Sequence, residues 1–205
     1  MGVGKTVQAL LAVALAHADA NESLPCSLVV CPSTLVGLWL NEVKKFFPSD
    51  SVFRPFALVG NGKERTSRWK ARPCDCNLVL TSYAVLRSDI KILESTCWKY
   101  CILDEGHLLK NPRTATAIAA RRLRANHKLI LTGTPVQNHV SELWATFDFL
   151  LPNFLGSQAA FSKAFARPIA NSQRPGASSE AISVGMERLK ILHQQVLPFI
   201  LRREK

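Results

Sequence analysis

Short apolar runs alternate with amphipathic segments along most of the chain. Runs typical of buried strands occupy residues 26–31, 52–59, 77–82, 98–103 and 127–131. The segments between them predict helices over residues 7–16, 35–47, 63–70, 83–92 and 114–125. This alternation predicts an α/β fold with a mostly parallel sheet and helices on both faces.

The last third of the chain has a different pattern. An aromatic-rich apolar stripe predicts a helix over residues 140–151, which we interpret as core. Residues 167–185 contain Pro, Gly and Ser without apolar periodicity, which predicts a flexible loop. We therefore expect one lobe over residues 1–166, then that loop, and a C-terminal helix with the start of a connection over residues 186–205.

The first residues fit the end of a phosphate-binding loop. Gly4, Lys5 and Thr6 match the last three positions of G-x-x-x-x-G-K-[ST], directly before a predicted helix. In such loops glycine allows close backbone approach, lysine binds the β- and γ-phosphates, and the hydroxyl ligates magnesium. The pattern predicts ATP and Mg²⁺ as cofactors, and we expect its first half and the preceding strand to lie before residue 1.

A second candidate site follows the apolar run 98–103. Asp104 and Glu105 come at the end of this predicted strand. An Asp in that position can hold the magnesium that Thr6 also ligates, and an adjacent Glu can activate the attacking water. We therefore predict Lys5, Asp104 and Glu105 as catalytic residues, with Thr6 and Asp104 at the metal.

The composition is that of a globular domain with an excess of positive charge. Hydrophobic residues make up 47% and charged residues 20% of the 205 positions, which excludes a disordered or fibrous chain. The net charge is +11, and residues 111–205 hold 13 Lys and Arg against 5 Asp and Glu. This balance favours a polyanionic partner, although a solvated basic surface would also produce it.

Cysteines and apolar runs both favour a soluble intracellular protein. Most of the 6 cysteines lie in or beside apolar runs, and Cys74 and Cys76 alone are close-spaced. A single C-x-C without a second pair or a nearby His is a poor zinc signal, so we predict reduced, buried cysteines. No apolar run approaches the roughly 20 residues of a membrane span, so we expect no membrane partner.

Taken together, these motifs resemble the first RecA-like lobe of Swi/Snf-type ATPases in helicase superfamily two. The matching segments are residues 1–8 (motif I), 31–35 with Trp39 and Glu42 (Ia), 81–83 with Asp89 (Ib), 104–107 with 110–111 (II), and 131–138 (III). The resemblance implies a RecA-like P-loop NTPase lobe that lacks its N-terminal strand. Residues 31–35, 104–107 and 192–203 most resemble the branch of the family that removes TATA-binding protein from promoter DNA.

The resemblance also implies roles for individual nucleotide-site residues. Backbone amides around Gly2 and Gly4 would hold phosphate oxygens beside Lys5 and Thr6. His107 would link the nucleotide to motif III, although the residue pattern alone fits a packed histidine equally well. The coupling residues of motif III would be Thr132, Gly133 and Thr134.

For DNA, the resemblance implies backbone contacts from motifs Ia and Ib. The candidates are Ser33, Thr34, Thr81 and Ser82. Short hydroxyl side chains suit phosphate contacts, which position a protein without reading sequence. Implied partners are duplex DNA, TATA-binding protein through regions absent from the chain, and a second lobe of the same polypeptide, in the nucleus.

Departures from the family pattern limit the expected activity. Gly106 replaces the more common Ala, and we expect this to be permissive and without catalytic cost. Because lobe two supplies the arginines that stabilise the transferring phosphate, we expect this chain alone to be nearly inactive as an ATPase. A non-catalytic nucleotide- or DNA-binding module and an RNA helicase are the alternatives.

Overall fold

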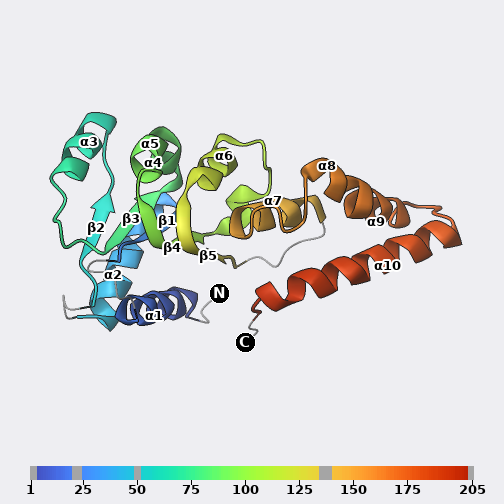
Figure 1. Cartoon of the computed structure of the whole chain (residues 1–205), viewed down its shortest axis with the longest axis horizontal. Helices are drawn as coiled ribbons and strands as arrows, with labels where there is room; N and C mark the ends of the chain where they lie inside the picture. Colours follow the sequence, from blue (N-terminus) through green and yellow to red (C-terminus); the bar gives the residue numbers. More distant parts are fainter. Residues whose placement is uncertain (1–3, 20–24, 49–51, 134–139, 203–205) are drawn as a thin grey trace. The chain divides into compact units, whose positions relative to one another are not determined.

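The computed structural model describes residues 4–19, 25–48, 52–133 and 140–202 (Figure 1). It divides into two compact units, Met1–Gly133 and Thr134–Lys205. This boundary differs from the predicted lobe over residues 1–166, because the aromatic helix after residue 139 packs in the second unit.

A five-stranded parallel sheet forms the centre of the first unit, in the order β2-β3-β1-β4-β5. Its strands are β1 (Ser27–Cys31), β2 (Pro55–Leu58), β3 (Leu78–Ser82), β4 (Cys97–Asp104) and β5 (Arg124–Leu131). Every pair of neighbouring strands is parallel, as the alternation of strands and helices predicts. The predicted α/β fold class is confirmed.

Helices cover both faces of this sheet. In Figure 1, α1 (Lys5–Ala18) and α2 (Val36–Phe46) lie below the strands. Above the strands lie α3 (Gly62–Lys70), α4 (Tyr83–Ser88), α5 (Ile90–Leu93) and α6 (Ala115–Arg122). Short 3₁₀ turns follow two strands, η1 (Ser33–Leu35) after β1 and η2 (Gly106–Leu109) after β4.

The lower face has a continuous apolar core. Leu10 and Val13 of α1 pack with Trp39 and Val43 of α2, and all four are at most 2% exposed. They cover inward-facing strand residues that include Val29. The spacing of Leu10 and Val13, and of Trp39 and Val43, places each pair on one side of its helix, which explains why α1 and α2 dock side by side.

A polar contact fixes the far end of α1. His17 Nε2 lies 2.8 Å from Ser27 Oγ at the start of β1, and Ser27 Oγ also accepts the Tyr100 amide. Burial, followed by the nearby Lys99 charge, lowers the pKa of His17. The imidazole is therefore neutral at neutral pH, and it holds the helix that begins at Lys5.

Several predicted elements of the first unit are shorter than expected. The predicted helix 114–125 ends at Arg122, because Arg124 and Ala125 already belong to β5. β2 covers only four residues, Pro55–Leu58, of the predicted strand 52–59. The predicted helix 83–92 is interrupted at Asp89, whose backbone has φ −117 and ψ 25. The Asp89 carboxylate accepts hydrogen bonds from Arg65 of α3, and this contact holds the interruption in place.

The second unit is helical. It contains α7 (Val140–Leu150), α8 (Gln158–Phe161), the π-helical turn η3 (Ser162–Ala166), α9 (Arg167–Ser172), α10 (Ser179–Val196) and the 3₁₀ turn η4 (Leu197–Phe199). Its core joins α7 to α8, α9 and α10 through Leu143, Trp144, Phe147, Phe161, Ile169, Leu192 and Val196. The interpretation of the α7 stripe as core is therefore confirmed.

The predicted loop over 167–185 is wrong, since most of it lies in α9 and α10. Pro168 stands in the first turn of α9, and the Ser178 hydroxyl caps α10 by accepting the Ala181 amide at 3.2 Å. Gly185 is buried, and a Cβ there would lie 2.2 Å from Ser172. The loop-like residues are thus a helix start, a cap and a close helix contact.

No helix in the described ranges is both long enough and apolar enough to cross a membrane.

Candidate functional site at the carboxyl edge of the sheet

The parallel strands bring many of the predicted site residues to one edge of the sheet. Cys31 pairs with Ser82, and Asp104 with Leu131, at the ends of their strands. Open parallel sheets bind ligands outside their carboxyl ends. Predicted site residues at or just after these ends are Ser33, Thr34, Thr81, Ser82, Asp104, Glu105, His107, Thr132 and Gly133.

Asp104 is fixed in orientation by three hydrogen bonds. Its Oδ2 accepts from Trp39 Nε1 at 2.9 Å, and its Oδ1 accepts from the Glu105 amide at 2.9 Å. Its backbone carbonyl accepts from the Tyr83 hydroxyl at 2.7 Å. The residue is 9% exposed, so the structure holds a nearly buried carboxylate at the end of β4.

The Tyr83 hydroxyl is a permanent donor in this arrangement. Burial, followed by the charge of Asp104, raises the pKa of Tyr83 well above its ordinary value. The phenol therefore stays protonated at any physiological pH. It ties the start of α4 to the strand end that carries Asp104.

Glu105 adopts a backbone conformation that is uncommon for a non-glycine residue. Its φ of 53° lies in the left-handed region. Such conformations cost on the order of 1–3 kcal/mol and cluster at functional sites. Glu105 Oε2 lies 3.2 Å from His107 Nδ1, and both side chains are partly exposed. The structure thus pairs His107 with the predicted base, while its link to motif III stays a prediction.

Gly106 is required by packing, which corrects the expectation that it is merely permissive. A Cβ at this position would lie 2.1 Å from Ile130 Cγ2 of β5. Ile130 is β-branched, so its methyl group cannot move away freely. The absent side chain lets the turn after Asp104 lie directly on β5.

The end of the phosphate-loop pattern meets the start of motif III. Gly4 has φ 68° and precedes the first residue of α1, Lys5. Lys5 Nζ is 3.9 Å from the point where a Cβ would stand on Gly133. Two segments far apart in sequence therefore converge, as the resemblance implies, while Gly2 and Thr134 lie outside the described residues.

The Asp104 environment fits a bound magnesium ion. Both hydrogen-bond donors to its carboxylate are neutral N–H groups, and the described residues place no ion pair on it. A buried carboxylate without a cation is costly, and oxygen ligands suit Mg²⁺. In the described ranges no group of three or more His, Cys, Asp or Glu could hold a metal. Mg²⁺ keeps several waters and binds nucleotide phosphates, so it needs few protein ligands.

Two of the four DNA candidates are buried. Thr81 is 0% exposed, and its hydroxyl donates to the Leu58 carbonyl at 2.8 Å. The prediction of a phosphate contact from Thr81 is therefore wrong in this structure, because the side chain binds the neighbouring strand. Ser82 is also buried, and its hydroxyl accepts the Val85 amide at 3.3 Å as the cap of α4.

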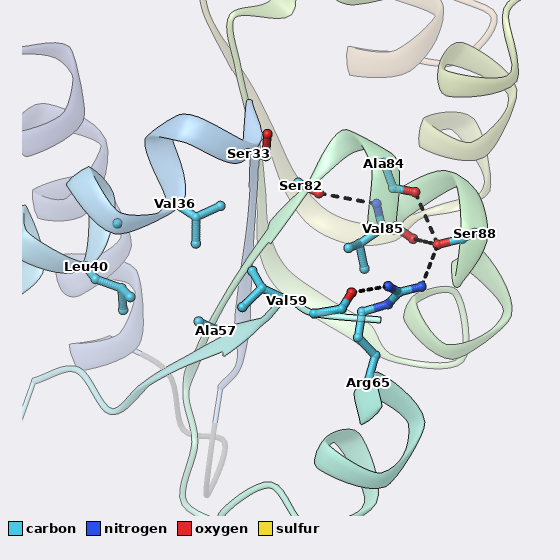
Figure 2. A pocket seen from close by; sticks show the side chains of 12 residues that line it. Ser33, Val36, Leu40, Ala57, Val59, Arg65, Ser82, Ala84, Val85 and Ser88 are labelled. Atoms are coloured by element: carbon cyan, nitrogen blue, oxygen red, sulfur yellow. Dashed lines mark hydrogen bonds between the residues drawn. The ribbon is translucent and has the colours of Figure 1, made fainter. Parts of the chain in front are cut away.

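The other two candidates, Ser33 and Thr34, are exposed at the start of η1. Ser33 lies at the rim of a hollow of about 560 Å³ between α2, the ends of β2 and β3, and α4 (Figure 2). Its lining is mostly apolar and includes Val36, Gly37, Leu40, Ala57, Val59, Gly60, Arg65, Ser82, Ala84, Val85 and Ser88.

Arg65 forms one wall of this hollow and is only 9% exposed. Its guanidinium donates to both carboxylate oxygens of Asp89, to the Gly60 carbonyl and to Ser88 Oγ. Figure 2 shows it reaching from α3 toward Ser88 on α4. The Asp89 hydrogen bond raises the pKa of Arg65, so the guanidinium stays charged in this buried position.

Sequence reasoning missed the positioning roles of three residues. Trp39 belongs to an apolar stripe, which indicates core but not a bond to Asp104. Tyr83 lies in a matched motif, but no spacing shows where its hydroxyl points. Arg65 lies in a predicted polar helix whose pattern gives no sign of a buried arginine, and the Asn61–Glu64 capping box was the available signal that this segment is ordered.

The whole chain, residues 1–205, matches the model of the SNF2-related domain family. It is 44% identical over 216 residues to "TATA-binding protein-associated factor mot1" of Aspergillus fumigatus. It is 42% identical over 215 residues to human "TATA-binding protein-associated factor 172". These alignments include all of this chain but only 11% and 12% of the two relatives.

Among solved structures, the fold is similar to the Sulfolobus solfataricus SWI2/SNF2 ATPase core in complex with double-stranded DNA. The TM-score is 0.80 at 35% sequence identity, with 99% of this chain and 38% of that chain covered. A second structure, of the "Sulfolobus solfataricus SWI2/SNF2 ATPase core domain", gives a TM-score of 0.79 at 34% identity. The RecA-like lobe that the motifs imply is therefore confirmed.

Replacing Trp39 by Phe should weaken magnesium-dependent nucleotide binding. The change keeps an aromatic ring in the core but removes the donor to the Asp104 carboxylate. Hydrogen bonds to charged groups contribute about 1.5–3 kcal/mol, so we expect about a tenfold weaker affinity or more. Titration calorimetry with a non-hydrolysable ATP analogue and Mg²⁺ measures this.

Trp98→Phe is the matched control, since the Trp98 indole is equally buried and donates to the Leu93 carbonyl at 3.0 Å. It should destabilise the fold to a similar extent and leave the affinity unchanged. Equal effects of both substitutions on binding would contradict the assigned role of Trp39.

Proposed function

The chain belongs to the SNF2-related family of ATPases, and on this basis we propose that it is the nucleotide-binding lobe of a DNA-dependent ATPase that remodels protein–DNA complexes. The observation that carries the proposal is the nearly buried Asp104 carboxylate, held at the sheet edge by neutral donors. Lys5 contributes a positive charge beside motif III, next to Gly133. Together these groups suit a magnesium–phosphate ligand.

Each nucleotide-site residue has a distinct proposed role. Lys5 neutralises the β- and γ-phosphates, and Thr6 with Asp104 holds Mg²⁺. The metal would supply charge neutralisation on the phosphates. Glu105 orients and deprotonates the attacking water, and His107 at 3.2 Å restrains its carboxylate.

Coupling of the nucleotide to DNA is proposed to pass through motif III. Gly133 lies beside Lys5, so a movement of Lys5 on loss of the γ-phosphate would shift Thr132 and Gly133. Gly106 packs on Ile130, which places the Glu105–His107 turn against the strand that leads to this motif. The end of motif I thus lies beside motif III, and motif II lies against the strand that leads to it.

Duplex DNA is the proposed polyanionic partner. The net charge of +11 and the exposed hydroxyls of Ser33 and Thr34 support it. A solved relative at 35% identity is described as a complex with double-stranded DNA. Thr81 is excluded from the proposed contact surface because it is buried.

The proposed protein target and cellular compartment rest on the names of the curated relatives. Curated relatives at 42–44% identity are named TATA-binding protein-associated factors. This chain spans about a tenth of their length, 11% and 12% in two of them, so we propose TATA-binding protein as a target of the whole protein. A role at promoters implies the nucleus.

A non-catalytic binding module is the alternative, and Lys5→Ala distinguishes it. We expect the substitution to weaken binding of a magnesium–ATP analogue by at least tenfold, because a charge that contacts phosphate is lost. Binding is the readout because arginines from lobe two complete catalysis in the family that the motifs resemble. Equal affinities of wild type and Lys5→Ala would favour the module.

Lys70→Ala is the control for this experiment. Lys70 is exposed at the end of α3, and its loss removes the same charge without touching the carboxyl edge. An equal loss of affinity in both variants would indicate a general charge effect and count against a specific role for Lys5.

Adding negative charge at Ser33 and Thr34 should weaken duplex DNA binding. We expect the double substitution S33D/T34D to lower affinity by roughly tenfold at low salt, because each carboxylate repels the phosphate backbone. Fluorescence anisotropy with duplex DNA and with single-stranded RNA would measure it and would also test the RNA-helicase alternative.

The sequence offers a matched control in a second Ser-Thr pair. Ser95 and Thr96 precede β4, at the opposite edge of the sheet. S95D/T96D should leave DNA affinity nearly unchanged. Tighter binding to RNA than to DNA, or equal losses in the two double variants, would contradict the proposed DNA surface.

A further inference from the structure

A pair of thiols lies at the amino-terminal edge of the sheet, away from the candidate site. Cys26 directly precedes β1, and Cys76 lies two residues before β3. Ser27 pairs with Leu78 in the parallel ladder, so the two cysteines flank the same junction of adjacent strands. Neither belongs to the nucleotide or DNA surface.

The backbone around both cysteines is tightly held. The Ser27 amide donates to the Asn77 carbonyl at 2.9 Å, which joins the residues next to each cysteine. The Lys99 amide donates to the Cys26 carbonyl at 2.7 Å, and the Cys76 amide donates to Pro73 at 3.1 Å. These bonds hold the backbone beside each cysteine in place, on two adjacent strands.

Their chemical environment favours one thiolate. Interaction with the neighbouring Cys26 side chain lowers the pKa of Cys76 to about 7. The Arg72 charge acts in the same direction, and its guanidinium lies 4.1 Å from the centre of the Trp69 ring. Reactive cysteines are found beside such positive charges.

The exposure of the two thiols and the number of nearby metal ligands limit the chemistry that this pair can perform. Cys76 is buried, at 6% exposure, whereas Cys26 is half-buried and is the more accessible of the two. In the described part of the chain no set of three His, Cys, Asp or Glu residues could hold a metal, so the pair lacks the ligands of a zinc site. Two adjacent thiols are, however, sufficient for a disulfide.

We propose that Cys26 and Cys76 form a reversible disulfide when the protein meets a peroxide. The Cys76 thiolate attacks one oxygen of hydrogen peroxide, the O–O bond breaks, and the released hydroxide takes up a proton to become water. Cys76 is then a sulfenic acid. The Cys26 sulfur attacks it, the S–S bond forms, and the sulfenic hydroxyl leaves as a second water with the Cys26 proton.

The disulfide would close a loop that contains α2, β2 and α3. These elements carry Trp39 and Arg65, the residues that fix Asp104 and the wall of the hollow. Closing the loop restricts the unfolded chain and leaves the carboxyl edge free. The modification therefore stabilises the part of the fold that positions the site, without occupying the site.

Mass spectrometry of the peroxide-treated chain tests the proposal. The reduced 205-residue protein is exposed to hydrogen peroxide, alkylated and cleaved on the amino side of Asp75, which separates Cys74 from Cys76. We expect a peptide containing Cys26 linked to one containing Cys76, which is lost after treatment with a thiol reductant. Alkylated Cys26 and Cys76 beside oxidised Cys74 or Cys97 would overturn the proposal.

Variants test the partner choice. Cys74 is exposed and two residues away, so C74S asks whether it takes part. The Cys26–Cys76 link should form in C74S and be absent in C76S. A link that disappears in C74S would assign the chemistry to Cys74. The wild-type peptide map does not depend on the folding of either variant.

Discussion

The hydrogen bond from the Trp39 indole to the Asp104 carboxylate joins the chemistry of this protein to its fold. Asp104 ends β4, Trp39 comes from α2 below the sheet, and the Tyr83 hydroxyl from α4 above the sheet binds the Asp104 carbonyl. One residue at a strand end is therefore bonded to helices on both faces. Its charge is unpaired among the described residues, which explains why a cation suits this position.

The strand order separates the proposed nucleotide site from the proposed DNA surface along the carboxyl edge of the sheet. β4 ends at Asp104, and β5 leads to Gly133, which lies beside Lys5. β2 and β3 border the hollow beside Ser33. α2 connects the two halves, because it begins beside the hollow and carries Trp39. A change in Asp104 on binding magnesium would therefore reach the proposed DNA surface through a single helix.

Arg65 supports the other half of the edge in a similar way. It brings a buried charge to Asp89 at the break between α4 and α5, and it fixes Ser88 and Gly60 around the hollow. A buried ion pair of this kind is weak evidence for stability, but it fixes orientation.

Patterns that depend on local periodicity were sufficient for the sheet, its parallel strands and the residues at their ends. Contacts between distant segments were not predictable, so neither the bond from Trp39 to Asp104 nor that from Arg65 to Asp89 could be found from the sequence. The same limit explains Thr81, a hydroxyl at a strand end whose partner, the Leu58 carbonyl, is on another strand. In residues 167–185, Pro, Gly and Ser act as helix start, close contact and cap, and composition alone cannot distinguish these roles from a loop.

The central claim is that Asp104 is oriented to hold magnesium for a nucleotide. The most direct measurement is the affinity for an ATP analogue with Mg²⁺ and with a chelator, in wild type and in Asp104→Asn. The substitution keeps the shape of the side chain and removes its charge. Our account expects Mg²⁺ to strengthen binding to wild type and to have almost no effect on the folded variant. An equal magnesium effect in both proteins would contradict it.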